Sequence, residues 1–383
     1  MWQEIESSIH ARDAKRGEVL IAKLLKTDLV PKDRERCYIY RARLRLLASR
    51  ANDAIEDILS LSASETFLQP KTQEILADAY LQHFEQSSTG FADKQDLVQA
   101  RTLYMAIVER HPFYANKGWV LYQLGRIHLI SGENEEAEAL FRMAIFQPSE
   151  FVALVAYCFE RLAFVAFYES HQRWEASVYI DKAIATYPTQ EPAEWLIQAY
   201  LSRSRILHTL DVNEAVRSAQ KAVGLASQNQ NEKALQAETL FVLADVLSKS
   251  AHTSREVIEV IQQFLQLGKA PAGVDVTWSR AYEMLGDALF STGRYEQAIE
   301  AYQNVLQFNP YHPWEEAVYY RISKGYYLLG QHQKALNALS KALNHGEKGV
   351  EAYVYELASS IHHALGQREH AERYSKKAQQ GNT

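Results

Sequence analysis

The segment from Ala281 to Pro310 places small, aromatic and turn-forming residues at intervals that fit one antiparallel pair of helices. Small residues occur where two helices approach closely, and bulky residues fill the gaps between them. The positions that carry the pattern are Tyr282, Leu285, Gly286, Gly293, Tyr295, Ala298, Tyr302 and Pro310. A single helical hairpin cannot bury its apolar face alone, so this unit predicts stacked neighbours along the chain.

The same pattern recurs on both sides of this segment. A clear unit runs from Trp119 to Pro148, and two more run from Tyr319 to Ala342 and from Tyr355 to Ala378. Looser units occupy the regions between them and toward the N-terminus. We count about nine hairpins, all of them helical.

These units resemble tetratricopeptide repeats, strongly in about four units and loosely elsewhere. The resemblance implies an all-α fold, a right-handed superhelical α-solenoid of about nine stacked helical hairpins. Ala137, Ala176 and Ala215 are 39 residues apart, whereas the family period is about 34 residues. We therefore expect longer helices or longer loops, and the superhelical pitch is left open.

Changes in composition divide the chain into three expected segments. Residues 1–112 form divergent hairpins with a basic cap, 113–268 a central solenoid, and 269–383 the C-terminal repeats with a capping helix. The polar stretch Gln86–Asp96 suggests a mobile insert. Gly268–Gly273 contains glycine and proline and ends a helix; it is either a bend between two sub-solenoids or an ordinary loop.

The composition limits the classes of protein to which this chain can belong. Hydrophobic residues make up 47% and charged residues 23% of the 383 residues, which is ordinary for a folded soluble chain. Cys37 and Cys158 belong to no CxxC pair, and the N-terminus lacks an apolar signal sequence, so a cytoplasmic location is expected. The apolar run Phe151–Tyr168 is interrupted by Glu160 and Arg161 and predicts a buried helix.

No pattern in the sequence indicates catalysis. The glycines are dispersed and form no phosphate-binding loop. The neighbouring His362 and His363 point in different directions on a helix, so they do not predict a metal site. We therefore expect no enzymatic activity, no cofactor and no metal ion.

In the tetratricopeptide family, ligands commonly lie in a concave groove lined by the first helix of each hairpin. Carried over to this chain, the resemblance implies a groove rich in aromatic and basic side chains, with the acidic Glu283 and Asp287 beside the basic patch of the following repeat. Aromatic residues beside arginine are typical of binding hot spots. The expected groove residues are Trp119, Tyr122, Arg126, Arg161, Tyr168, Tyr200, Ser204, Tyr320, Arg321, Lys324 and Tyr327.

These groove residues predict a partner protein that presents a helical or extended segment with acidic character. The alternative is that the same side chains only pack between adjacent helices. A one-residue error in helix phase would exchange the groove with the core.

Basic residues gather near the N-terminus, where residues 12–50 hold twelve Lys and Arg against five Asp and Glu. Arg34, Arg41 and Arg45 would share one helical face as a basic patch. Such a face can meet an acidic protein or nucleic acid. It is more often a solvated end cap, so nucleic acid is not expected as a partner.

The resemblance thus implies a non-catalytic scaffold or adaptor that binds another protein. Two alternatives stay open: a regulatory sensor that responds to a peptide or small ligand, and a regulatory subunit of an enzyme encoded elsewhere. The oligomeric state is also left open.

Overall fold

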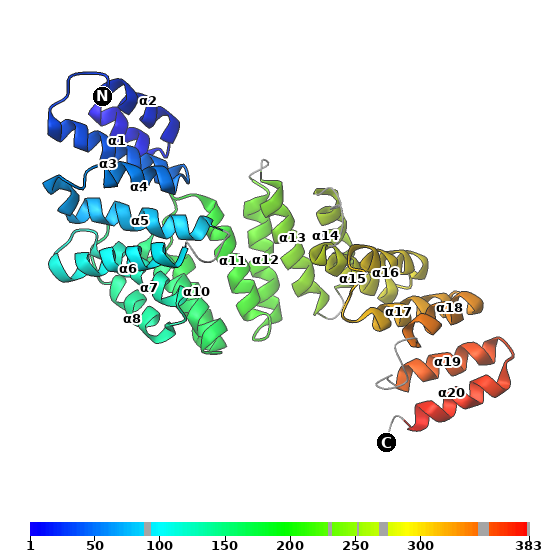
Figure 1. Cartoon of the computed structure of the whole chain (residues 1–383). Coiled ribbons are helices and arrows are strands. Elements are labelled where there is room, and N and C mark those ends of the chain that lie inside the picture. The colour runs from blue at the N-terminus through cyan, green and yellow to red at the C-terminus, as the bar shows by residue number, and fades with distance from the viewer. Residues whose placement is uncertain (88–92, 229–231, 251–252, 268–274, 344–351, 381–383) are drawn as a thin grey trace. The chain divides into compact units, whose positions relative to one another are not determined.

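The fold is described by a computed structural model that covers residues 1–87, 93–228, 232–250, 253–267, 275–343 and 352–380. Over these ranges the chain forms twenty α-helices and no β-strand. Consecutive helices run as antiparallel pairs that stack on one another (Figure 1). The all-α hairpin fold expected from the sequence is therefore confirmed, with ten hairpins where about nine were counted.

The chain divides into two compact units, residues 1–191 and residues 192–383. The boundary falls inside the predicted central segment 113–268, and the three-part division stays a prediction. In unit 1 the hairpins are α1 (Trp2–His10) with α2 (Ala14–Leu24), α3 (Pro31–Leu47) with α4 (Ala51–Leu59), α5 (Pro70–Gln86) with α6 (Asp93–Arg110), α7 (Lys117–Ile130) with α8 (Asn134–Ala144), and α9 (Leu154–Phe164) with α10 (Arg173–Thr186).

Two short helices complete unit 1. A 3₁₀-helix, η1 (Glu65–Leu68), precedes α5, and a π-helix, η2 (Val165–Glu169), continues α9. In unit 2 the hairpins are α11 (Ala193–Leu207) with α12 (Val212–Ala226), α13 (Lys233–Ser248) with α14 (Ser254–Leu267), α15 (Val276–Ser291) with α16 (Tyr295–Phe308), α17 (Glu315–Leu328) with α18 (His332–Leu343), and α19 (Ala352–Ala364) with α20 (Arg368–Gln380).

The first helices of successive hairpins pack against one another within each unit. Such contacts join α1 to α3, α3 to α5 and α7 to α9 in unit 1, and α11 to α13, α13 to α15 and α17 to α19 in unit 2. We call these first helices the inner helices. They line the side of each unit where the sequence places the binding groove.

Glycine lets the two helices of a hairpin approach closely. A Cβ atom at Gly125 of α7 would lie 2.7 Å from the ring of Phe141 in α8, and one at Gly286 of α15 would lie 2.6 Å from the ring of Tyr302 in α16. No side chain fits at these distances without displacing the ring. These are positions that the sequence pattern assigned to close helix packing.

In seven hairpins the turn has one residue in the left-handed conformation. Gly132, Gly293, Gly330 and Gly366 supply it, with φ between +71° and +77°. In three hairpins of unit 1 a non-glycine residue has the same sign of φ: Arg12 at 56°, Ser49 at 59° and His171 at 54°. These turns keep the geometry without the glycine that makes the repeat recognisable.

Two predicted loops fall largely on positions without a described structure. Residues 88–92 of the Gln86–Asp96 stretch, and the whole of Gly268–Gly273, lie outside the described residues. The apolar run Phe151–Tyr168 forms α9 and η2. Among the helices that can be described, none is both long and apolar enough to span a membrane.

Candidate functional site: a cavity between inner helices of unit 1

A cavity of about 290 Å³ lies against the inner helices of unit 1. Its lining combines apolar side chains with charged and polar ones. It is lined by Ile9 of α1; Arg43, Leu46 and Leu47 of α3; Lys71, Glu74, Ile75 and Asp78 of α5; Asn116 and Trp119 at the start of α7; and Glu150 and Phe151 in the loop before α9. We call it the unit 1 cavity.

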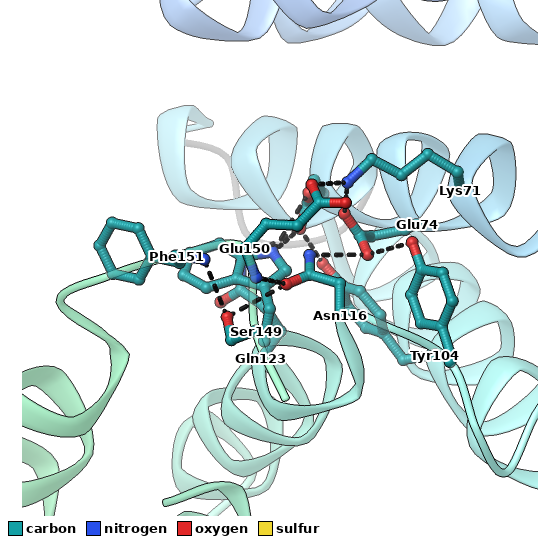
Figure 2. Close-up of polar contacts among 11 residues, drawn as sticks. Lys71, Glu74, Tyr104, Asn116, Gln123, Ser149, Glu150 and Phe151 are labelled. Carbon is teal, nitrogen blue, oxygen red and sulfur yellow. Dashed lines mark hydrogen bonds and ion pairs between the residues drawn. The ribbon is translucent and has the colours of Figure 1, made fainter. Parts of the chain in front are cut away.

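Glu74 is the centre of a hydrogen-bond network beside this cavity (Figure 2). Its side chain is only 4% exposed. Lys71 Nζ lies 3.0 Å from Oε1, while the Tyr114 hydroxyl and Asn116 Nδ2 donate to Oε2 over 2.7 and 3.0 Å. Both oxygens of this buried carboxylate therefore have partners, as burial of a charge requires.

The same network reaches the loop before α9. Lys71 Nζ also lies 2.6 Å from Oε2 of Glu150. The side-chain oxygen of Asn116 accepts from the Ser149 hydroxyl and from the backbone N–H of Glu150, over 3.1 and 2.8 Å. Figure 2 shows Lys71, Glu74, Asn116 and Glu150 converging from α5, α7 and this loop. The wall of the cavity is thus held in place before any partner arrives.

Asp78, one helical turn after Glu74, is a second hydrogen-bond centre. Its Oδ1 accepts from the Tyr104 hydroxyl, from Trp119 Nε1 over 3.1 Å and from Gln123 Nε2 over 3.1 Å. All three donors are neutral. Burial, and then repulsion from Glu74, raise the pKa of Asp78 to about 6.

Aromatic rings form the apolar wall of the cavity. The ring of Trp119 meets Phe151 edge to face with centroids 5.1 Å apart, and it stacks on Tyr122 at 5.5 Å. Phe151 in turn meets Tyr157 of α9 at 5.0 Å. Such pairs fix the ring orientations, so the wall is rigid.

The predicted groove residues of unit 1 are brought together only in part. Trp119 lines the cavity and Tyr122 is buried behind it. Arg126 already pairs with Glu85 of α5, and Arg161 lies 2.7 Å from Oε2 of its neighbour Glu160.

Tyr168 is the most exposed of these residues, at 51%. It lies in the π-helix η2, against the rings of Phe164 and Phe167. Tyr122, Arg126 and Arg161 therefore take part in contacts within the protein. This agrees with the alternative in the sequence analysis, in which these side chains pack between adjacent helices.

The predicted groove residues of unit 2 are also engaged with neighbours. Ser204 is fully buried and donates to the backbone oxygen of Ala215, so it lies in the core of its hairpin. The Tyr200 ring lies beneath Lys221 Nζ. Tyr320 meets Tyr353 edge to face, and Tyr327 packs on His332.

Charged groups of successive inner helices pair with one another in unit 2. Arg321 of α17 lies 2.9 Å from Glu283 and 3.4 Å from Asp287, both in α15. Lys324 is exposed and lies near the rings of Phe290 and Tyr320. The alternating charges predicted along this groove therefore include ion pairs within the protein.

The predicted basic patch is partly neutralised. Arg41 and Arg45 both pair with Asp57 of α4, whose side chain is 3% exposed, while Arg34 is exposed.

Within the described ranges no group of three His, Cys, Asp or Glu side chains is placed to hold a metal ion.

Sequence reasoning missed the two acidic residues that organise the cavity, Glu74 and Asp78. They are four residues apart on α5, and residues 75–77 between them and 79–81 after them are mostly apolar. Two carboxylates on one face within this mostly apolar stretch were the available signal, because such groups need partners when buried.

Comparison with known proteins agrees with the fold. A family model described as tetratricopeptide repeat matches residues 279–348. A 42-residue stretch is 45% identical to the small glutamine-rich tetratricopeptide repeat-containing protein 2 of Mycosarcoma maydis. That match covers 11% of this chain and 12% of that protein, so the chain spans about an eighth of its curated relative.

Two solved structures show similar arrangements of helices. A signal transduction ATPase with numerous domains, which carries a tetratricopeptide repeat sensor and comes from Pyrococcus horikoshii, is 13% identical with a TM-score of 0.56, over 93% of this chain and 53% of that one. A thermophilic tetratricopeptide repeat protein of Thermus thermophilus is 20% identical with a TM-score of 0.43, over 54% of this chain and 96% of that one.

The first of these likenesses shows the fold alone. Tetratricopeptide repeats, the family matched at residues 279–348, generally mediate contacts between proteins. Together with the helical hairpins and the glycine contacts, the family match shows that residues 279–348 form tetratricopeptide repeats within a chain of stacked helical hairpins.

Proposed function

We propose that this chain is a non-catalytic scaffold that binds a segment of a partner protein, and that the unit 1 cavity receives one side chain of that segment. The observation that carries the proposal is the cavity itself, which combines accessible apolar surface with a preformed polar wall. A helical or extended segment lying along the inner helices would present side chains to it.

The composition of the walls supports binding. Trp119 and Phe151 offer rigid aromatic area, and Leu47 at the end of α3 is 43% exposed. Rigid aromatic side chains in a pocket are typical of the few residues that dominate an interface. Because the network around Glu74 already holds the wall, little conformational freedom is lost on binding.

Two leucines provide a matched test. Leu47 ends the inner helix α3 and lines the cavity, whereas Leu59 ends the second helix α4 and does not. Both are 43% exposed. Lysine at either position places a charge on a surface of equal exposure, but only Leu47→Lys puts that charge at the cavity.

The experiment screens the full chain against a random peptide library and measures affinities of the enriched peptides by fluorescence anisotropy. We expect Leu47→Lys to weaken binding about tenfold or more, and Leu59→Lys to leave it unchanged. Equal affinities for both variants, or a screen that enriches no peptide, would overturn the proposal.

A further inference from the structure

One oxygen of Asp78 is left almost without a partner. The hydrogen bonds from Tyr104, Trp119 and Gln123 all reach Oδ1. Oδ2 receives only a second, long contact from Trp119 Nε1 at 3.4 Å. Asp78 lines the unit 1 cavity, so this oxygen belongs to a side chain that a ligand in the cavity can reach.

Asp78 also has no basic partner within the described residues, unlike several other carboxylates of the inner helices. Those carboxylates have an arginine or lysine within ion-pair distance. Examples are Glu74 with Lys71, Glu85 with Arg126, and Glu283 with Arg280 and Arg321. An ionised carboxylate in an apolar surrounding is costly until a cation joins it.

Neither of the two basic side chains that line the cavity, Lys71 and Arg43, forms an ion pair with Asp78. Lys71 serves both Glu74 and Glu150. Arg43 lines the cavity but forms no ion pair with any of the three carboxylates there. The cavity lining holds three carboxylates against two basic groups, so its formal charge is negative when all are ionised.

Resting on the proposed function, we infer that the side chain received by the unit 1 cavity is a lysine or arginine of the partner segment, with its cationic end at Asp78. The aliphatic stem of such a side chain packs on apolar surface while its head keeps a charged partner. The rings of Trp119 and Phe151 add a further attraction for a cation. The sequence predicted an acidic partner segment; the cavity favours a basic one.

The test compares two peptides and three proteins. From a peptide enriched in the screen, one version keeps its lysine and a second carries norleucine, which has the same stem without the ammonium group. Binding of both is measured with wild type, with Asp78→Asn and with Glu135→Gln. Asp78→Asn keeps a side-chain oxygen for the three donors but removes the charge. Glu135→Gln is the control, because Glu135 lies on α8, is exposed and does not line the cavity, so the variant removes one carboxylate charge elsewhere in the same unit.

We expect the enriched peptides to share a lysine or arginine, and wild type to prefer the lysine peptide over the norleucine peptide about tenfold. Asp78→Asn should reduce this preference to about twofold or less, whereas Glu135→Gln should retain it, since its carboxylate lies outside the cavity. Circular dichroism melting confirms that each variant is folded.

The two proposals fail in different ways. Peptides that are lost on Leu47→Lys but bind Asp78→Asn with the full lysine preference would overturn the inference and leave the proposed function standing. Enriched peptides without any basic residue would do the same. Peptides that bind wild type and Leu47→Lys equally would overturn both.

Discussion

The side-chain amide of Asn116 joins two inner helices to the loop before a third. Its Nδ2 donates to Oε2 of Glu74 over 3.0 Å, and its Oδ1 accepts from the backbone N–H of Glu150 over 2.8 Å. One buried amide thus sets the distance between α5, the start of α7 and the loop that carries Phe151. The shape of the unit 1 cavity depends on this contact.

Replacing Asn116 by alanine should therefore destabilise unit 1. The change removes one donor from buried Glu74 and leaves the Glu150 N–H without its acceptor, which should cost about 2 kcal/mol. Thermal unfolding followed by circular dichroism measures the effect. The control is Asn304→Ala in α16, whose side chain only donates to the backbone of Glu300; it should change stability by less than about 0.5 kcal/mol. Similar melting shifts for the two variants would contradict this role of Asn116.

A second prediction concerns the close helix contact at Gly286. Alanine at this position places Cβ 2.6 Å from the Tyr302 ring, and relieving that overlap should cost about 1 to 3 kcal/mol. A Cβ at Gly224, within α12, would meet no described residue outside its own helix within 4 Å, so Gly224→Ala should stabilise by about 0.5 to 1 kcal/mol. Urea unfolding of both variants checks the opposite signs. Two variants that shift in the same direction would show that steric contact does not explain Gly286.

A third prediction concerns the left-handed turn at Ser49. A non-glycine residue at a φ of 59° is strained by about 1 kcal/mol, so Ser49→Gly should raise the melting temperature. The reverse change, Gly366→Ser at a φ of +76°, should lower it by a similar amount. Differential scanning calorimetry measures both. A lower melting temperature for Ser49→Gly would mean that its side chain contributes more than the turn costs.

A fourth prediction concerns Asp78 and the dependence of the unfolding free energy on pH. Burial, then repulsion from Glu74, raise its pKa to about 6 in the folded chain, above the value of about 3.9 in an unfolded chain. A group with a raised folded pKa contributes its full stability below the unfolded pKa, and that contribution is lost as the pH rises through the folded pKa. Asp78→Asn does not titrate. We therefore expect the unfolding free energy of Asp78→Asn, relative to that of wild type, to rise by on the order of 2 kcal/mol between about pH 4 and about pH 7.

Urea unfolding of wild type and Asp78→Asn at several pH values measures this difference. Other titrating groups are common to both proteins and cancel in the comparison. A difference that stays constant with pH, or that narrows as the pH rises, would mean that Asp78 is not held in an unfavourable ionised state.

Much of the fold was predictable because the repeat is a local steric pattern. Gly286 and Tyr302 lie within one hairpin, and their spacing alone indicates that two helices touch. The N-terminal hairpins were harder to recognise because Arg12 and Ser49 occupy turns where glycine is usual. The backbone adopts the same turn, but the residue that signals it is missing.

The candidate site was predictable only in part, because its contacts join residues far apart in sequence. Trp119 was expected in the groove and does line the cavity. Its partner Asp78 lies 41 positions earlier, and no local spacing connects the two. Arg321 and Glu283 were each noticed, but their pairing depends on the phase of two helices in successive repeats.

The most direct test of the central claim is photo-crosslinking of an enriched peptide to the full chain with a photoreactive amino acid at position 47 or at position 59. We predict that the probe at position 47 crosslinks to the peptide at or beside its lysine or arginine, and that the probe at position 59 gives no crosslink. Crosslinks of equal yield at both positions, or at position 59 alone, would show that the partner segment does not bind in the unit 1 cavity.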